Sequence, residues 1–350
     1  MIQGFFSSPY FYVKIILKVG VTMIHVGTIG TGLIVDNFLS AVKDNEGMIC
    51  QAVYSRSLEK AKSFANKHNV TLYYENLDAF LNDETIQVVY IASPNSLHYE
   101  HAKKSLLANK HVICEKPFTS TMKECEELIN LAKEKHLLLF EAITTIHLPH
   151  VQIIKDLLSH LGTLRMVQCN FSQYSSKYDD YLKGKNPNVF TLTYSGGALS
   201  DINIYNLHLI TYLFGEPNDI QYFANIGRTN VDTSGILILT YDTFLCSCIA
   251  CKDSRSDNIL QFQGEKGFIK VNSQPSRMMN VHMYTNEDEK HIEIQDNDNA
   301  LYYEVKDFIT LINNNDYTKT YQLLDHTLLV MKLYEEARKK ANIYFEVDKQ

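Results

Sequence analysis

The chain has 350 residues, of which 45% are hydrophobic and 21% charged, so it has the composition of a globular protein and a length typical of about two domains. Its formal charge of −7 argues against a nucleic-acid partner, because no basic surface is present to collect phosphates. Seven scattered cysteines lack the dense pattern of a disulfide-stapled secreted domain, so we expect reduced thiols and a cytoplasmic location. No apolar run reaches the roughly 18 to 20 residues that span a bilayer, so we expect no membrane segment.

The first 22 residues differ in character from the rest of the chain. They are aromatic and apolar, but Lys14 and Lys18 interrupt the apolar stretch, and neither a basic start nor an A-x-A cleavage site is present. A signal peptide is therefore disfavoured. We expect residues 1–22 to be an N-terminal extension, such as a misassigned start would add, with Met23 opening the first domain.

Short apolar strands alternate with helical patterns from Met23 to residue 143. The expected strands cover 24–30, 48–54, 87–92, 111–114 and 137–140. The expected helices between them cover 31–43, 58–67, 96–108 and 122–135, and Ser57 is a good N-cap for the second. This alternation is typical of βαβ units, so we expect an α/β Rossmann domain with a parallel sheet over 23–143.

The pattern changes after residue 143. A helix at 150–159, a strand at 164–171, a Tyr-rich loop at 172–188 and a helix at 198–213 precede β signals from 220 to 293. Two helices, near 301–313 and 321–341, end the chain. Runs of strands flanked by helices indicate an α+β domain over 144–350 with a large, mostly antiparallel sheet.

A glycine turn follows the first expected strand and opens a helix, which is the setting of a dinucleotide-binding site. Gly30 would make the tight turn and Gly32 would let the backbone approach a pyrophosphate at the helix N-terminus. Val35 occupies the third glycine position, so the motif is incomplete. The cofactor contacts predicted here are Gly30, Thr31, Gly32, Leu33 and Ile34.

The end of the second strand bears on which cofactor is bound. An NAD site usually places an acid there for the ribose 2′-hydroxyl, but no acid occurs before Glu59. Arg56 and Ser55 instead suit a 2′-phosphate. We therefore expect NADP, with NAD as the alternative.

Two further motifs carry candidate catalytic groups. Glu115-Lys116-Pro117 follows a strand at the carboxyl edge, where open α/β sheets bind ligands. On the helix after Gly196-Gly197, Asp201, Tyr205 and His208 fall at i, i+4 and i+7, which predicts one face of a helix.

These motifs together resemble the Gfo/Idh/MocA family, named for glucose–fructose oxidoreductase, inositol dehydrogenase and a rhizopine catabolism protein. The resemblance covers about residues 23–345 and rests on three segments in chain order, 92–98 (ASPNSLH), 110–117 (KHVICEKP) and 196–201 (GGALSD). It implies a nicotinamide cofactor, with Lys116 as the active-site lysine. It also implies an open second-domain sheet that joins subunits into a homodimer or homotetramer. Further cofactor contacts are expected from Ser93, Asn95, His98, Glu115 and Lys116 itself.

Tyr205 stands where many members of this family carry histidine. That departure resembles the branch with glucose–fructose oxidoreductase and dimeric dihydrodiol dehydrogenase, and it counts against an inositol dehydrogenase. We expect Tyr205 to exchange a proton with the substrate oxygen, with its pKa lowered by the Lys116 ammonium. Asp201 would fix Lys116 or a sugar hydroxyl. His208 and Tyr174 are expected either to pack or to contact substrate.

The function predicted is hydride transfer between NAD(P) and a CH–OH group of a small sugar, polyol or dihydrodiol. Two alternatives stay open. One is a non-catalytic NAD(P)-sensing regulator, since the family includes a repressor of galactose genes. The other is a glycosidase that uses NAD⁺ in a redox cycle. No metal site is expected, because Cys246, Cys248 and Cys251 are better explained as small buried hydrophobes.

Overall fold

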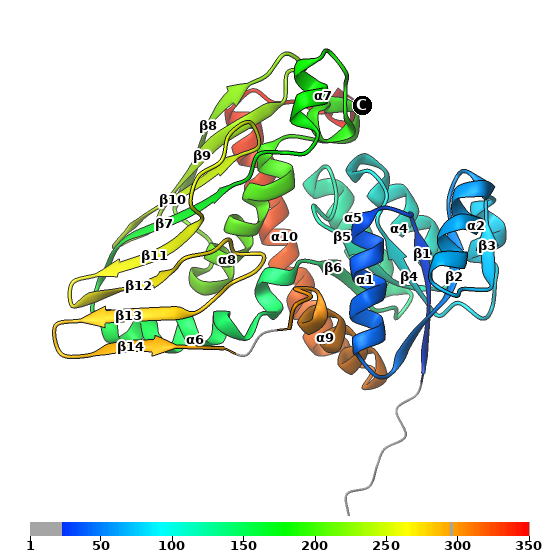
Figure 1. The fold of residues 1–350 in the computed structure, drawn as a ribbon, viewed down its shortest axis with the longest axis horizontal. Helices are drawn as coiled ribbons and strands as arrows, with labels where there is room; N and C mark the ends of the chain where they lie inside the picture. Colours follow the sequence, from blue (N-terminus) through cyan, green and yellow to red (C-terminus); the bar gives the residue numbers. More distant parts are fainter. Residues whose placement is uncertain (1–22, 295–296, 350) are drawn as a thin grey trace, which may run out of the picture.

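The computed structural model describes residues 23–294 and 297–349, so the extension predicted for 1–22 lies outside the described residues. Two sheets dominate the structure, and helices fill the space between them (Figure 1). This arrangement confirms the expected fold class, a parallel Rossmann sheet followed by a larger, mostly antiparallel one.

The first sheet has six parallel strands in the order β3-β2-β1-β4-β5-β6. They are β1 (Ile24–Ile29), β2 (Met48–Tyr54), β3 (Leu72–Tyr74), β4 (Val88–Ile91), β5 (His111–Glu115) and β6 (Leu139–Ala142). The helices that follow the first five strands are α1 (Leu33–Asp44), α2 (Leu58–Lys67), α3 (Leu77–Leu81), α4 (His98–Leu107) and α5 (Met122–Glu134). All four residues of β4 are buried, as expected for a parallel strand covered on both faces.

The last two helices of the chain return to this first sheet. In α9 (Tyr302–Asn313), Phe308 packs against Phe140 of β6 with ring centroids 4.9 Å apart. The long α10 (Tyr317–Lys340) contacts α5 and β6 and also reaches β8 of the second sheet. The division at residue 143 stays a prediction, and the C-terminal helices form part of the cover of the first sheet.

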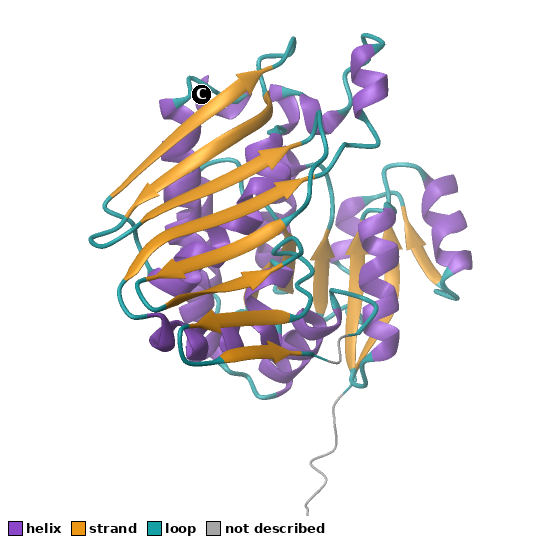
Figure 2. Ribbon diagram, turned by 60° about the vertical axis from the view of Figure 1, so that its left-hand side comes forward, coloured by secondary structure: helices purple, strands orange, loops and turns teal. Residues whose placement is uncertain are grey.

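The second sheet has eight strands in the order β14-β13-β12-β11-β7-β10-β9-β8, and only the β7–β10 pair is parallel. They are β7 (Leu164–Ser172), β8 (Asp219–Ile226), β9 (Asp232–Thr240), β10 (Leu245–Cys251), β11 (Ile259–Gly264), β12 (Gly267–Val271), β13 (Val281–Thr285) and β14 (Glu289–Ile292). The helices α6 (Pro149–Leu158), α8 (Ile204–Phe214) and α10 cover one face. No helix of the described residues lies over the other face, as Figure 2 shows.

Burial alternates along these strands as one covered face requires. In β10, Cys246 and Cys248 are buried, whereas Leu245 is exposed on the open face. The prediction that these two cysteines act as small buried hydrophobes is confirmed, and Cys251 is only partly buried. Within the described ranges, no group of three His, Cys, Asp or Glu side chains could hold a metal ion.

Some element boundaries differ from the sequence-based expectations. The helix expected from 198 begins as a wide π-turn, Leu199–Asn203, before α8. The Tyr-rich loop contains a short helix, α7 (Tyr178–Leu182). Helix α10 begins four residues earlier than expected because Asp316 caps it by accepting from the Lys319 amide at 2.9 Å. No helix in the described part of the chain is long and apolar enough to cross a membrane.

Candidate active site

The glycine turn has the backbone that a pyrophosphate cradle needs. Gly30 has a φ of +122°, and a Cβ there would lie 2.7 Å from the Ala92 carbonyl oxygen, so only glycine fits. Gly32 is the N-cap of α1, with no heavy atom within 4 Å of where its Cβ would stand. The first backbone amides of a helix have no partner within the helix, and the open space at Gly32 leaves room for an anion beside them. These residues fit the diphosphate of a dinucleotide.

The groups expected to select NADP lie next to this turn. Arg56 is exposed directly after β2. Ser57 caps α2 by accepting from the Lys60 amide, and the Ser55 hydroxyl accepts from the Ser57 amide at 3.4 Å. A cavity of about 540 Å³ beside them is lined in part by Thr31, Ser57 and Lys60. Lys60 is a further cation that the sequence reasoning missed.

Lys116 lies at the end of β5 and reaches across to the π-turn before α8. Its Nζ donates to the Asp201 backbone oxygen at 2.7 Å and to Asp201 Oδ1 at 3.0 Å. It also lies 4.9 Å from the centre of the Tyr205 ring. The three expected catalytic residues are therefore brought together, although 85 residues separate Lys116 from Asp201.

A second lysine, which sequence reasoning missed, completes this cluster. Lys252 follows β10 directly and donates to Asp201 Oδ2, so one carboxylate bridges two ammonium groups. Its side chain is only 6% exposed. The signal available in the sequence was a lysine straight after a buried strand, the same setting that singled out Lys116.

The charges of this cluster fix its protonation. Burial raises the pKa of Asp201, but Lys116 and Lys252 outweigh burial and hold the pKa below its usual value. Burial lowers the pKa of Lys116, but attraction to Asp201 and Tyr205 outweighs it, so the pKa is raised. Asp201 is thus an anion and Lys116 a cation over a wide pH range.

Tyr205 departs from the expectation of a lowered pKa. Lys116 does lower it, but burial raises it more, and Glu115 and Asp201 add to that rise. The prediction is corrected: the pKa of Tyr205 lies above its usual value of about 10, and the phenol keeps its proton at neutral pH. The group is therefore set up as a proton donor.

Comparison with known proteins shows which family the chain belongs to. Residues 24–143 match the model of an oxidoreductase family with an NAD-binding Rossmann fold, and residues 151–270 match that of the GFO/IDH/MocA C-terminal domain. The scyllo-inositol 2-dehydrogenase (NADP(+)) IolU of Bacillus subtilis is 37% identical over 93% of this chain and 99% of its own. The chain belongs to the Gfo/Idh/MocA family. It is an NAD(P)-binding oxidoreductase, and the expected resemblance is confirmed.

Less similar proteins share part of the sequence, or the fold, of this Gfo/Idh/MocA protein. The trans-1,2-dihydrobenzene-1,2-diol dehydrogenase of Sus scrofa is 29% identical over 70% of the chain and 73% of its own length. The 3-ketoreductase KijD10 of Actinomadura kijaniata, solved with NADP and TDP-benzene, superimposes with a TM-score of 0.81 at 22% identity. That superposition covers 91% of this chain and 98% of KijD10, and it supports the fold alone.

Other predicted site residues hold the loops of this family member in place. His98 is buried, and its two ring nitrogens lie 2.9 Å from the carbonyl oxygens of Pro117 and Ser93. It therefore ties the loop after β4 to the loop that carries Lys116. Asn95 donates to the Ser195 carbonyl oxygen at 3.0 Å. Contacts of these residues with cofactor stay predictions.

His208 is packed inside the fold, which is one of the two alternatives expected for it, and its contact with substrate stays a prediction. It is fully buried, with Nδ1 3.2 Å from His326 of α10 and Nε2 3.4 Å from Glu141 of β6. These contacts place His208 in the core.

Glu141 links the elements that carry the expected catalytic groups. Its Oε1 accepts from the Phe118 amide at 3.2 Å, and its Oε2 accepts from the Thr327 hydroxyl at 2.8 Å. Together with His208, it joins the Lys116 loop to α8 and α10. The conformation of this loop relative to Tyr205 therefore depends on a buried carboxyl group that lies 23 residues beyond Phe118 in the sequence.

Tyr174 contacts residues of its own loop rather than Lys116. It is exposed, donates to Asp179 Oδ1 at 2.7 Å, and packs edge-on against Tyr178. A substrate contact from Tyr174 stays a prediction.

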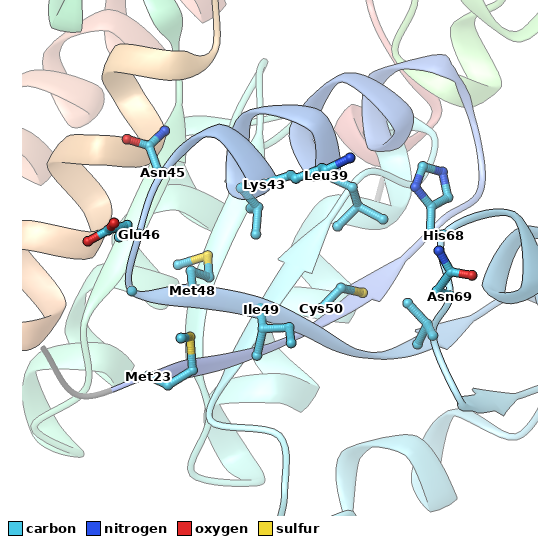
Figure 3. Close-up of a pocket in the computed structure, with 13 residues that line it drawn as sticks. Met23, Leu39, Lys43, Asn45, Glu46, Met48, Ile49, Cys50, His68 and Asn69 are labelled. Carbon is cyan, nitrogen blue, oxygen red and sulfur yellow. The ribbon is translucent and has the colours of Figure 1, made fainter.

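A cavity of about 680 Å³ lies at the opposite end of the first sheet (Figure 3). It is lined by the starts of β1 and β2, including Met23, Met48 and Ile49. Ligands of open α/β sheets bind at the carboxyl ends of the strands, and this cavity lies at the amino ends. We therefore assign the site to the Lys116 cluster.

Proposed function

We propose that this protein is an NADP-preferring oxidoreductase that interconverts a hydroxyl and a carbonyl group on a sugar, a polyol or a dihydrodiol. The observation that carries the proposal is the cluster in which Lys116 lies between Asp201 and Tyr205 at the carboxyl edge of the first sheet. This arrangement sets an ammonium donor and a protonated phenol side by side.

Each group has a distinct role in this proposal. The Lys116 ammonium donates a hydrogen bond to the substrate oxygen and stabilises negative charge on it. The Tyr205 hydroxyl gives its proton to that oxygen when a carbonyl is reduced, and takes it back when an alcohol is oxidised. Asp201 holds Lys116 in place, and Lys252 keeps Asp201 ionised. The nicotinamide cofactor, when bound, supplies or accepts the hydride.

Two kinds of observation support NADP. Arg56 and Ser55 stand at the end of β2, where an NAD-preferring site carries an acid. A relative at 37% identity is named for NADP(+). NAD remains the alternative cofactor.

The names of relatives guide the choice of substrate. They include a scyllo-inositol 2-dehydrogenase and a dihydrobenzenediol dehydrogenase, whose named substrates carry neighbouring hydroxyls on a six-membered ring. The expectation that Tyr205 counts against an inositol dehydrogenase is thus not supported, and a cyclitol is added to the candidate substrates.

The open face of the second sheet supports self-association. Phe223, Ile236, Leu245 and Phe268 are exposed on its strands, with Phe223 at 65%. An apolar sheet face of this kind is costly to leave in water. We propose a homodimer or homotetramer formed through this face, as the family resemblance implies.

The test is a titration with NADPH and with NADH, followed by turnover assays. Because the chain has no tryptophan, binding can be followed by the emission of the reduced nicotinamide. We expect tighter binding of NADPH, and NADP⁺-dependent oxidation of scyllo-inositol, a dihydrodiol or an aldose. Absence of binding to either cofactor would refute the proposal, and tighter NADH would refute the NADP preference.

A further inference from the structure

A small cavity of about 220 Å³ lies beside Tyr205, and the proposed proton transfer does not involve it. It is bounded by the start of α1, the ends of β5 and β6, the loop 272–280 and the start of α9. Its walls include Ile34, Glu115, Thr144, Tyr205, Arg277 and Glu304. Ile34 belongs to the first turn of α1, directly after the glycine turn, so the cavity lies between the expected diphosphate position and the catalytic phenol.

Two polar side chains in this wall have buried atoms without a partner. Glu304 Oε2 and Thr144 Oγ1 make no hydrogen bond to any described residue. Glu304 is 2% exposed and Thr144 is 8% exposed. Native structures rarely leave buried polar atoms unpaired, because desolvation without a replacement hydrogen bond is costly. Both residues line the same cavity, which indicates that a ligand group completes their hydrogen bonding.

The electrostatic surroundings decide which ligand group fits. Burial raises the pKa of Glu304, and the carboxyl groups of Glu115, Asp307 and Glu141 raise it further. Both influences favour the protonated form of Glu304, in which a hydroxyl donor and a carbonyl acceptor lie side by side. A primary carboxamide presents the complementary pair, a carbonyl acceptor beside an N–H donor.

We propose that Glu304 and Thr144 form a subsite for the carboxamide of the nicotinamide ring. Glu304 pairs with the carboxamide through both of its oxygens, and the Thr144 hydroxyl supplies a further hydrogen bond. Holding the carboxamide fixes which face of the ring is turned toward Tyr205. The proposal rests on the proposed function, since it requires a nicotinamide cofactor.

Arg277 is the competing partner for Glu304 within the chain. It lines the same cavity from the 272–280 loop, and an ion pair between the two would fill the acid's hydrogen bonding without a ligand. The two assignments predict different binding data, because only the subsite assignment makes affinity depend on the carboxamide itself.

The experiment measures dissociation constants of three ligands by calorimetry. NADP⁺ carries the carboxamide, its 3-acetylpyridine analogue replaces the amide nitrogen by a methyl group, and 2′-phospho-ADP-ribose lacks the ring. Wild-type protein is compared with Glu304→Leu, Glu304→Gln and Thr144→Val. Asp307→Asn is the matched control, because Asp307 lies one turn along α9 and is bonded to His147 outside the cavity.

We expect Glu304→Leu to weaken NADP⁺ about tenfold and to leave 2′-phospho-ADP-ribose unchanged. The preference of the wild type for NADP⁺ over the acetylpyridine analogue should largely disappear in this variant. Thr144→Val should weaken NADP⁺ by a few-fold. Glu304→Gln, which keeps a donor and an acceptor, and Asp307→Asn should stay within about threefold of the wild type.

The results separate failure of the subsite from failure of the function. If the wild type binds NADP⁺ and the preference over the analogue is the same in Glu304→Leu, the subsite is overturned and the function stands. An equal loss for all three ligands in Glu304→Leu, with Glu304→Gln unaffected, would also overturn it and indicate a packing role. If the wild type binds none of the three ligands, the proposed function itself fails.

Discussion

Replacing Asp201 by asparagine tests the electrostatic core of the site. The substitution keeps the shape of the side chain but removes the charge that pairs with both Lys116 and Lys252. Lys252 is 6% exposed and Lys116 13% exposed, so two nearly buried ammonium groups would lose their counter-ion.

The size of the effect follows from burial. Removing one partner of a fully buried ion pair costs roughly 3 to 5 kcal/mol. The Asp201 side chain is 33% exposed, so solvent screens part of its interactions. We therefore expect Asp201→Asn to lower the free energy of unfolding by about 2 to 3 kcal/mol.

The pH dependence has a definite sign. The pKa of Asp201 is lowered in the folded state, so its stabilising contribution is present above its unfolded pKa of about 3.9 and is lost as pH falls through the folded pKa. The stability difference between wild type and Asp201→Asn should be full at neutral pH and should shrink below about pH 4.

Urea denaturation at several pH values measures this difference. Asp180→Asn is the control, because Asp180 pairs with Lys185 at the surface and should change stability by less than about 1 kcal/mol. Turnover of Asp201→Asn should fall as well, since Lys116 loses its fixed position. An unfolding midpoint and a turnover both equal to those of the wild type would refute the role assigned to Asp201.

Three further substitutions test single groups. Lys116→Ala should lower kcat at least about a hundredfold with the Kd for NADPH nearly unchanged, and an unchanged kcat would remove Lys116 from the mechanism. Tyr205→Phe should lower kcat by about 10² to 10⁴ with little change in stability, as measured by steady-state kinetics and urea denaturation; full activity would assign the proton to another group. Arg56→Ala should weaken NADPH at least about tenfold more than NADH in fluorescence titrations. An equal loss for both cofactors would contradict a contact with the 2′-phosphate.

The sequence by itself determined the features that depend on neighbours in the chain. The apolar strand before Gly30, the glycine turn and the helix after it are local, and β1 and α1 form where the pattern predicts them. The same holds for Lys116, because a residue that ends a parallel strand lies at the carboxyl edge whatever the neighbouring strands are.

Only the tertiary structure decided which distant groups meet at that edge. Lys252 reaches Asp201 because β10 packs against the π-turn that carries Asp201, and Glu304 reaches the cavity beside Tyr205 because α9 returns to the first sheet. Periodicity reports contacts within one element, whereas pairing of strands and packing of helices set contacts across the fold. The charge state of Tyr205 likewise depended on burial, which no local pattern expresses.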